Sequence, residues 1–317
     1  TVQKMLIRTP MLSQVGSVVK YCGISLNTEV QVVQRLSRVA KQANIKHGVI
    51  IMVELGDLRE GIMPHHAIDF ISKIIKLPNI TIKGIGSNLA CRYGVAPDDK
   101  KMTLLSNLAN EIEDTFGINL DIISGGNSAS IIWALNQNGK TRINNLRIGE
   151  AIFFGCEPLN KEQIKGLYTD AALLTAEVIE SKVKPSSPWG NRGKNAFGEK
   201  EHIQNRGAVS QAILALGRQD VCTSGLIAPD GMNILSSSSD HLIIETSKEP
   251  LVIGEKVQFK LDYSTLLASM SSNSIHKVFN ELCTIRNQKE NNQLKKRNSF
   301  VQFIAAHLIT RNKIERL

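Results

Sequence analysis

The sequence predicts an α/β fold, a parallel sheet covered by helices, followed by a smaller and mainly β region. Two patterns lead to this prediction. Over roughly the first half, short apolar runs alternate with amphipathic stretches in six βα-like units, which is typical of a parallel sheet with helices outside it. After about Tyr168, strand-like segments follow one another with little helix between them. A chain of 317 residues suits one large domain with a smaller one.

The elements of the first part alternate along the chain. The run from Val49 to Val53 is apolar throughout, as in a strand that is buried on both faces. Apolar residues from Val30 to Ala40 recur with a helical period, and Thr28 is a good N-cap for that helix. Predicted strands cover residues 5–8, 24–26, 48–55, 81–86 and 120–123, predicted helices cover 14–21, 28–43, 66–75, 101–116 and 130–135, and a last unit runs from a strand at 145–149 into 151–155.

After about residue 168 the sequence has patterns typical of β-strands, up to a second change in composition near residue 279. Predicted strands cover 173–183, 207–216, 232–237, 242–246 and 256–261, and loops cover 184–188 and 190–198. After Phe279 the chain is rich in Asn, Gln, Lys and Arg, and residues 300–309 could form one amphipathic helix. We therefore divide the chain into an α/β domain at 1–168, a β domain at 169–279 and an unassigned basic tail at 280–317.

Most of the net charge of +9 lies in the tail. Residues 280–317 carry eight Lys or Arg against three Glu, so the tail has +5 and the rest, nine less five, has +4. A solvated tail is favoured over a nucleic-acid-binding one, because Phe300 and Phe303 are its only aromatic residues. No apolar run is long enough to span a membrane. The five cysteines are scattered without a CxxC pair, which indicates no metal site and no disulfide framework and makes a reducing cytoplasm the default location.

Polar residues follow the ends of several predicted strands. Gly56 and Gly61 bracket Asp57, Arg59 and Glu60 just after the buried apolar run. In α/β barrels the chemistry lies at the carboxyl ends of the strands, although a solvated loop is the alternative explanation for any single case. Because three later strands end in the same way, these ends are the candidate functional site.

The sequence Ser-Gly-Gly-Asn-Ser at 124–128 has the composition of a phosphate cradle. Its glycines allow the backbone to approach a ligand closely, and its serines add hydroxyl donors at a helix start. Alone it is a weak signal, since such turns are common, but Arg147 and Gly149 add a cation and a second glycine turn after the next strand. An anion site is therefore predicted. The absence of GxGxxG and GKS argues against a dinucleotide or a P-loop nucleotide.

Several of these motifs, in fixed order, resemble the ornithine racemase branch of the alanine-racemase-like enzymes, which are fold-type-III enzymes that use pyridoxal 5'-phosphate (PLP). The resemblance covers roughly residues 4–279 and rests on segments 53–61, 84–91, 124–128, 146–151, 215–220, 238–242 and 263–267. It implies a TIM-type (β/α)8 barrel followed by a mainly β C-terminal domain, in a homodimer whose sites are completed across the interface. It also implies a PLP-dependent racemase that removes and returns the proton at Cα of an amino acid held as an aldimine, with ornithine as the first expected substrate.

The resemblance further implies roles for residues at the strand ends. Ser128 and the backbone at Gly149 and Glu150 would hold the PLP phosphate, and Arg147 would face the pyridine nitrogen. Because arginine stays protonated and can only donate, that nitrogen would remain unprotonated. Arg59 would approach the phenolic oxygen of the cofactor or the carboxylate of the substrate.

Four more residues complete the expected cofactor site, namely Asn88, Ser124, Gly126 and Asn127. Asn88 stands where alanine racemases proper carry a histidine beside the ring of the cofactor. The rest belong to the glycine and serine turn that follows the predicted strand at 120–123.

Two departures from the family pattern concern catalysis. The family's Schiff-base lysine lies at the end of the first barrel strand, before the first residues matched here, and we expect it to be absent from this chain. Lys20 is interpreted as a solvated helix lysine, because sites of this fold lie at strand carboxyl ends. Arg218 stands where alanine racemases have a catalytic tyrosine, so the second base is unknown and the candidates are Arg218, Asp240 and His241.

Three functions remain open at this point: an amino-acid racemase, a non-catalytic PLP-binding protein, and an inactive remnant without the catalytic lysine. The predicted β domain argues against the second, because single-domain relatives resemble the barrel half alone. Asp57 or Glu60 could meet the ammonium group of an ornithine side chain, but a solvated loop charge is the favoured interpretation for both.

Overall fold

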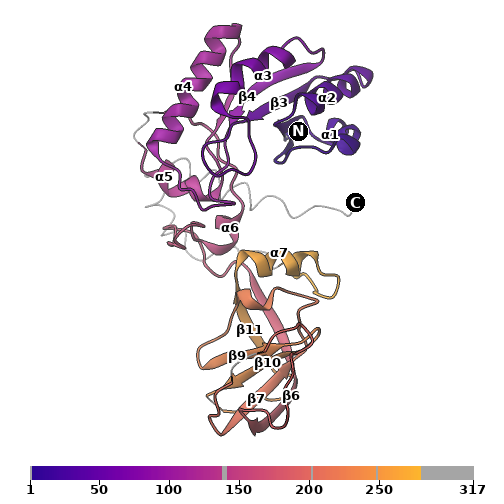
Figure 1. Cartoon of the computed structure of the whole chain (residues 1–317), viewed down its shortest axis with the longest axis vertical. Helices are drawn as coiled ribbons and strands as arrows, with labels where there is room; N and C mark the ends of the chain where they lie inside the picture. The colour runs from indigo at the N-terminus through magenta and orange to yellow at the C-terminus, as the bar shows by residue number, and fades with distance from the viewer. Residues whose placement is uncertain (1, 138–140, 201–202, 248, 280–317) are drawn as a thin grey trace, which may run out of the picture.

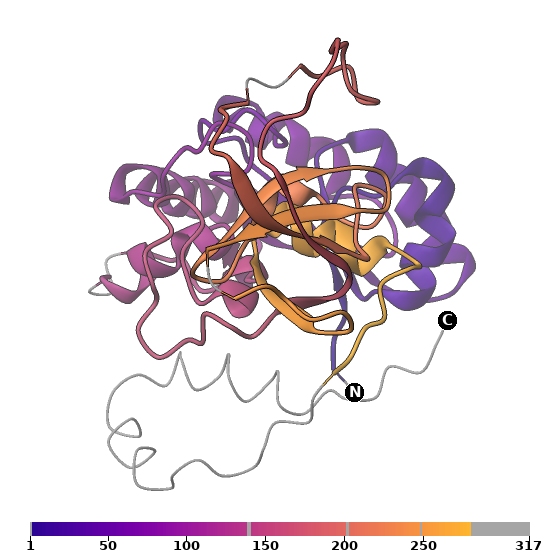
Figure 2. The ribbon, with the colours of Figure 1, turned by 90° about the horizontal axis from the view of Figure 1, so that it is seen from below.

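The computed structural model describes residues 2–137, 141–200, 203–247 and 249–279. The basic tail and the helix expected at 300–309 lie outside the described residues. Two sheets lie in separate parts of the molecule, and Figure 1 shows the first part above the second. Seen from below, the second sheet lies in front of the helices of the first part (Figure 2).

The first part is built on a five-stranded sheet whose neighbouring strands are all parallel and follow the order of the chain, β1-β2-β3-β4-β5. The strands are β1 (Met5–Leu6), β2 (Ile24–Asn27), β3 (His47–Met52), β4 (Ile80–Gly86) and β5 (Ile122–Ser124). Sequential parallel order is what a barrel requires. The sixth predicted unit is wrong in detail, because 145–149 forms only an isolated parallel bridge, Ser124 to Asn145, and residues 150–154 are helical.

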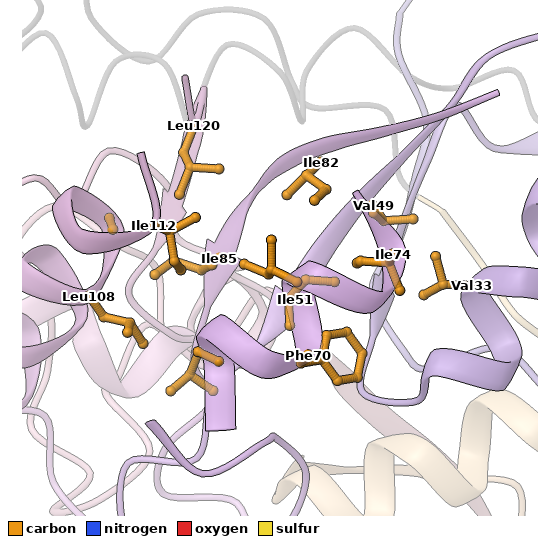
Figure 3. Close-up of a cluster of buried hydrophobic side chains, with 14 of the residues drawn as sticks. Val33, Val49, Ile51, Phe70, Ile74, Ile82, Ile85, Leu108, Ile112 and Leu120 are labelled. Atoms are coloured by element: carbon orange, nitrogen blue, oxygen red, sulfur yellow. The ribbon is translucent and has the colours of Figure 1, made fainter. Parts of the chain in front are cut away.

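Helices cover one face of this sheet and bury its main core (Figures 1 and 3). They are α1 (Val15–Tyr21), α2 (Val30–Gln42), α3 (Ala67–Ile74) and α4 (Asp99–Phe116). The strands point alternate residues to the two faces, so Val49 and Ile51 of β3 join the helices, whereas Ile50 and Met52 pack on the other face with β2. Short helices α5 (Ile131–Leu135) and α6 (Glu150–Phe154) follow β5, with 3₁₀ turns at Leu12–Gln14, Pro64–His66 and Ser128–Ser130.

The helix ends show where local prediction held and where it did not. Helix α4 starts after Asp98, whose carboxylate accepts from the backbone N–H of Lys101 at 2.8 Å, and it ends at Gly117 in a left-handed conformation. Thr28 was a wrong N-cap, because α2 begins at Val30 and Glu29 occupies the cap position without a side-chain hydrogen bond. Burial of the apolar face therefore fixes α2 without a cap, as is usual for amphipathic helices in proteins.

The second part is a six-stranded antiparallel sheet in the order β8-β11-β6-β7-β10-β9. Its elements are β6 (Leu173–Pro185), β7 (Ala208–Leu214), β8 (Leu226–Ile227), β9 (Met232–Ser237), β10 (Leu242–Thr246), β11 (Lys256–Leu261), a 3₁₀ turn at Thr223–Gly225 and α7 (Tyr263–Ser271). Buried and exposed residues alternate along β6, where Leu174, Ala176 and Val178 face the second core. Phe154, at the end of α6, packs against this core and so links the two parts.

Helix α7, which the sequence did not predict, packs Leu266 against the second core but also buries two hydroxyl side chains and exposes three large apolar ones. Thr265 and Ser269 are buried, and the hydroxyl of Thr265 donates to the carbonyl of Cys222 at 2.7 Å. The large apolar residues Tyr263, Leu267 and Met270 point outward, each more than half exposed. A helix of a self-contained domain normally buries its apolar stripe, so this face is suited to contact with another protein surface.

Strands β4 and β5 approach each other so closely that only glycine fits at one position. A Cβ at Gly84 would lie 1.8 Å from the carbonyl oxygen of Ile122. This approach brings the carboxyl ends of the two strands, at Gly86 and Ser124, into register with each other. The segments that follow these strands therefore begin side by side.

A small polar cluster is buried within the same sheet. The Nε2 atom of His47 lies 2.8 Å from the hydroxyl of Ser25, to which the side chain of Asn27 donates at 3.1 Å. All three residues are fully buried. Burial lowers the pKa of His47 below its usual value, because the charged imidazolium would lose its hydration.

Candidate functional site

The strand ends that the sequence singled out converge at one edge of the parallel sheet. Asn88 follows β4, Ser128 follows β5, and Arg147 lies just past the bridge at Asn145. Hydrogen bonds join these segments directly, including one of 2.8 Å from Arg147 to the carbonyl of Ser87. Residues that are up to 60 positions apart in the chain therefore meet at this edge.

Arg147 is the central cation, and only neutral groups hold it. One guanidinium nitrogen donates to the hydroxyl of Ser124 at 2.6 Å, and the other donates to the carbonyl of Ser87 at 2.8 Å and to Asn88 Oδ1 at 3.4 Å. The hydroxyl of Ser124 donates in turn to Asn145 Oδ1 at 2.7 Å. No carboxylate in the described part of the chain lies within ion-pair distance of Arg147.

Burial of this cation lowers the pKa of Arg147 to about 10, because the charged form loses hydration. Glu60 opposes that shift and Arg59 adds to it, both through space. At neutral pH the group therefore stays protonated, as a partly desolvated cation without a counter-ion. Such a cation favours a ligand that supplies an acceptor or a negative charge.

The turn predicted from the sequence as a phosphate cradle places Ser128 against the start of α6. The buried hydroxyl oxygen of Ser128 accepts from the backbone N–H groups of Gly149 and Ala151, both at 3.2 Å, at the start of α6. This leaves the Ser128 proton to be donated. Gly126 has a φ of +116°, and a Cβ there would lie 2.6 Å from the hydroxyl of Ser130. Gly149 is exposed, with open space where a Cβ would stand.

Glu150 contributes through its backbone position, because its side chain pairs with Lys161 at 3.0 Å. The predicted involvement of Glu150 thus rests on its place in the first turn of α6. Its carboxylate is turned to a lysine of the following loop.

Asn127 and Asn88 tie the two strand ends together. The side-chain amide of Asn127 donates to Asn88 Oδ1 at 3.1 Å, to the carbonyl of Leu89 at 2.8 Å and to the Sγ of Cys91 at 3.2 Å. Its Oδ1 accepts from the N–H of Ala129. The Nδ2 of Asn88 and the hydroxyl of Ser87 are buried and have no partner within the described ranges. Asn127 is thus occupied by the scaffold, whereas Asn88 retains a donor for a ligand.

Arg59 lies on the loop after β3 and pairs with Glu60, with Nη2 to Oε1 at 2.6 Å and a second contact through Nε. This hydrogen bonding raises the pKa of Arg59. The loop is shaped by Glu54, whose carboxylate accepts from the N–H groups of Gly56 and Leu58.

The interpretation of Asp57 as a solvated loop charge is wrong. Asp57 is fully buried, and its carboxylate accepts from the backbone N–H groups of Arg92 at 2.9 Å and Tyr93 at 3.1 Å. Its partners lie 35 and 36 residues further along the chain, so no local pattern indicated them. Asp57 holds two loops together, and these bonds occupy it.

The candidates for the second base, Arg218, Asp240 and His241, lie together in the second part. Arg218 bonds to Glu199 at 2.9 and 3.0 Å and stacks on the ring of Phe197 at 3.9 Å. Its backbone N–H donates to the carbonyl of Ser238 at 2.9 Å, so its turn lies beside the one that carries Asp240 and His241. These bonds, like the 2.7 Å contact of Asp240 with His241, stay within the second part. His241 lowers the pKa of Asp240.

Lys20 lies far from this edge, as expected for a solvated helix lysine. It occupies the last turn of α1, is exposed, and stands 5.1 Å from the ring of Tyr21. Together with Gly23 and Lys46 it lines a depression at the amino ends of β2 and β3, opposite the site.

Sequence reasoning missed Cys91, Ser87 and Asn145 as members of this region. Cys91 and Ser87 belong to the segment 84–91 that carried the resemblance, but no role was predicted for either side chain. Asn145 was assigned to a strand, whereas its side chain accepts from Ser124. Within the described residues no helix is long and apolar enough to cross a membrane, and no group of His, Cys, Asp and Glu could hold a metal ion.

Comparison with known proteins gives consistent results. Residues 2–157 match the family described as alanine racemase, N-terminal domain. The chain is 42% identical over 279 residues to an ornithine racemase of Acetoanaerobium sticklandii, covering 87% of this chain and 79% of that protein. It is 35% identical over 277 residues to a lysine racemase of Thermotoga maritima, covering 87% and 77%.

Solved structures show a similar fold at low identity. An alanine racemase from Streptomyces coelicolor A3(2) gives a TM-score of 0.62 at 14% identity, covering 85% of this chain and 73% of that one. An alanine racemase from Clostridium difficile 630 gives 0.60 at 15% identity, covering 82% and 68%. At these identities the likeness establishes the fold, a parallel half-barrel sheet with a mainly β second domain, and confirms the predicted fold class.

Proposed function

The chain belongs to the alanine-racemase-like family, and on that premise we propose that it is a PLP-dependent racemase of a basic amino acid. One observation carries the proposal. Arg147 is a partly desolvated cation without a carboxylate partner in the described chain, beside an open glycine turn and a serine hydroxyl. The similarity to an ornithine racemase and a lysine racemase supports a basic substrate, with ornithine as the first candidate.

The residues present fit PLP. The proton of Ser128 and the backbone at Gly149 and Glu150 would hold the phosphate, and the exposed Gly149 leaves room for it. When bound, PLP withdraws electrons from Cα of the amino acid and so makes its proton acidic. Asn88 Nδ2, a buried donor without a partner in the described chain, is available to an oxygen of the cofactor or substrate.

Arg147 would act as a fixed donor toward the pyridine nitrogen. Ser124, the Ser87 carbonyl and Asn88 hold its guanidinium in place. Since the pKa of Arg147 remains about 10 after burial, the group donates at neutral pH and does not accept. An acceptor placed against it would stay unprotonated.

Arg59 and Glu60 would recognise the substrate. Arg59 supplies a cation for the substrate carboxylate, and the partly exposed Glu60 is the carboxylate of this loop that stays available to a side-chain ammonium group, because Asp57 is occupied. Binding would exchange the internal Arg59–Glu60 pair for two pairs with the substrate. Substrates that lack the ammonium group would leave Glu60 with Arg59 and bind more weakly.

The second proton-transfer group is proposed to come from the cluster of Arg218, Asp240 and His241. We place it in a homodimer in which one subunit completes the site of its partner. The outward apolar face of α7 (Tyr263, Leu267 and Met270) supports such an association. A cytoplasmic location is also proposed, in keeping with the four free thiols of the described cysteines.

The decisive experiment combines cofactor binding with racemisation. Purified protein is titrated with PLP by absorbance, and L-ornithine, L-lysine and L-alanine are assayed by chiral chromatography. We expect PLP to bind to this chain. Because the family's Schiff-base lysine is expected to be absent from it, racemisation is assayed in a fusion with a relative's segment that carries that lysine, and there ornithine or lysine should be racemised faster than alanine. Ser128→Ala should weaken PLP about tenfold, the value of one hydrogen bond to a charged group, whereas Ser271→Ala on the exposed side of α7 should not.

The two competing functions give different results in the same experiment. Stoichiometric PLP binding that Ser128→Ala weakens, without racemisation of any of the three amino acids, would establish a non-catalytic PLP-binding protein. Failure to bind PLP at all would establish the inactive remnant.

A further inference from the structure

We propose that Cys91 is a modification site at the mouth of the cofactor site, where its thiol exchanges with small anionic disulfides and the attached group excludes the site's ligand. The exclusion rests on the proposed function, whereas the thiol reaction can be measured without it. Cys91 lies on the segment after β4 and is the exposed member of the four described cysteines; Cys22, Cys156 and Cys222 are partly covered.

The first argument is position. The Sγ of Cys91 accepts a hydrogen bond of 3.2 Å from Asn127, and the same amide group donates to Asn88 Oδ1. Asn88 also contacts Arg147. Two asparagines, Asn127 and Asn88, thus link the thiol to the central cation. A group attached to Cys91 would stand against the side chains expected to meet the cofactor.

The second argument is a buried donor in the same group of contacts. Asn88 is only 6% exposed, and its Nδ2 has no partner within the described part of the chain. An unsatisfied donor of this kind costs free energy unless a ligand or water accepts from it. Cys91 therefore borders a place that is built to take a polar ligand, and is not an isolated surface thiol.

The third argument is charge. Arg59 and Arg147 both lie within electrostatic reach of Cys91, since negative charge at the thiol raises the pKa of each guanidinium. Arg59 is paired with Glu60, whereas Arg147 has no carboxylate partner in the described chain, so these three groups together leave one positive charge that attracts a reagent carrying carboxylates. The two arginines also lie where the proposed substrate and cofactor bring their own negative groups.

The chemical step is thiol–disulfide exchange with a low-molecular-weight disulfide. The Cys91 thiol gives its proton to water, and the sulfur attacks one sulfur of the disulfide. A new S–S bond forms, the old one breaks, and the other half leaves as a thiolate with the electron pair. A free thiol reverses the reaction, so the block is reversible.

The test uses the aromatic dicarboxylate disulfide DTNB on wild-type protein, on Cys91→Ser and on Cys222→Ser, with release of the coloured thiolate followed in time. Serine at position 91 keeps an acceptor for Asn127. We expect one fast equivalent in wild type, its loss in Cys91→Ser and its retention in Cys222→Ser. Mass spectrometry of the labelled peptide identifies the thiol, including any contribution from Cys283. An uncharged disulfide should react about tenfold more slowly at Cys91.

Protection then tests the location. PLP at ten times its dissociation constant should slow the fast phase about tenfold, because only the unliganded fraction reacts. A fast phase that survives in Cys91→Ser, or that PLP leaves unchanged although it binds, would overturn the inference. If Cys91 reacts first and PLP does not bind by absorbance, the proposed function fails and the modification site stands.

Discussion

Both parts of the molecule pair arginines with carboxylates, as Arg142 pairs with Glu113 in the first part, but the strand-end edge of the first part also holds one arginine by neutral groups alone. In the second part, Arg206 makes a two-fold pair with Glu245 at 2.6 and 2.7 Å, and Arg218 pairs with Glu199. In the first part, Arg147 is held by a hydroxyl, a carbonyl and an amide oxygen. A cation that the fold has already neutralised needs no ligand. The hydrogen-bond partners of an arginine, more than the presence of the arginine itself, therefore distinguish a candidate binding site from a structural ion pair.

The sheets differ in a way that explains this. A parallel sheet gathers the segments after successive strands at one edge, so β3, β4 and β5 bring distant loops together. An antiparallel sheet sends successive connections to opposite ends. Its charged residues meet partners on the same strand, as Lys184 meets Glu180 on β6, or on a neighbouring segment, as Glu245 of β10 meets Asn233 of β9. One edge of the first sheet therefore gathers side chains from distant segments, whereas the connections of the second sheet are divided between its two ends.

The largest expected change in stability comes from a substitution at the close contact between β4 and β5 in the first part. Gly84→Ala places a methyl group against the backbone of Ile122, and we expect a loss of about 3 kcal/mol or more, since the backbone must move. Gly193→Ala, in an open loop of the second part, should change stability by less than about 0.5 kcal/mol. Urea unfolding of both variants measures the difference. Equal stability would show that β4 and β5 do not approach as described.

The next largest expected effect is a change in reaction specificity when Arg147 is replaced. The test uses the fusion that carries the family's Schiff-base lysine. There Arg147→Glu replaces a donor with a carboxylate that favours a protonated pyridine nitrogen, so transamination should rise relative to racemisation and the racemisation rate should fall about 10²-fold. Bound PLP should remain near stoichiometric, because Ser128 and the backbone after Arg147 are unchanged. Arg206→Gln in the second part should leave the product ratio unaltered. Loss of PLP in Arg147→Glu would instead make Arg147 part of the phosphate anchor.

Acid should weaken the first part before the second. The pKa of His47 is lowered by burial, so below about pH 6.5 the unfolded chain takes up a proton that the folded chain does not. Stability should then fall with pH by at most about 1.4 kcal/mol per pH unit until the folded pKa is reached. In the second part, Arg206 lowers the pKa of Glu245, whose contribution is kept until the pH falls below its unfolded value, about 4.5.

Hydrogen exchange followed by mass spectrometry can separate the two parts, with peptides from β3 and from β10 compared between pH 8 and pH 4. His47→Asn, which keeps a hydrogen-bonding group near Ser25, should remove the loss near pH 6 in β3. His276→Asn, at an exposed position, should not. Simultaneous loss of protection in β3 and β10 would contradict the expected order.

The smallest effect on folding should come from the outer face of α7. Leu267 is 57% exposed, so Leu267→Ser should change the free energy of unfolding by no more than about 0.5 kcal/mol. If this face joins two subunits, the variant should nevertheless shift toward monomer in sedimentation velocity, while Leu267→Met should not. An unchanged sedimentation profile would place the subunit contact elsewhere.

A structural element could be predicted from the sequence where the residues that define it are close together in the chain. The strand at 47–52 was evident because its apolar run is continuous, and α4 was evident from its helical period. The outcome for 145–149 was not, since its backbone pairs with residues 123–126 only in an isolated bridge and its side chains contact Ser124 and Ser87, which no local pattern indicates. Helix α7 was missed because its buried residues are small hydroxyl side chains.

The site was predicted as a set of strand ends, and that level of detail followed from local sequence. The resemblance pointed to Arg147 and Ser128, but it did not show that Arg147 lacks a carboxylate. Asp57 was misjudged because its partners are backbone groups of Arg92 and Tyr93, which carry no sequence signal. Contacts with main-chain atoms of distant segments are the part that residue patterns do not reveal.

The buried carboxylate of Asp57 has a kinetic consequence. It accepts from the N–H groups of Arg92 and Tyr93, and the side chain of Arg92 returns a bond to the carbonyl of Leu58. The loop that carries Arg59 and the segment that carries Cys91 are therefore locked to each other and should open as one cooperative unit. The exchange rates of the Arg92 and Tyr93 amides would then report how often the two segments separate, and that frequency is an upper limit for any molecule that must pass between them.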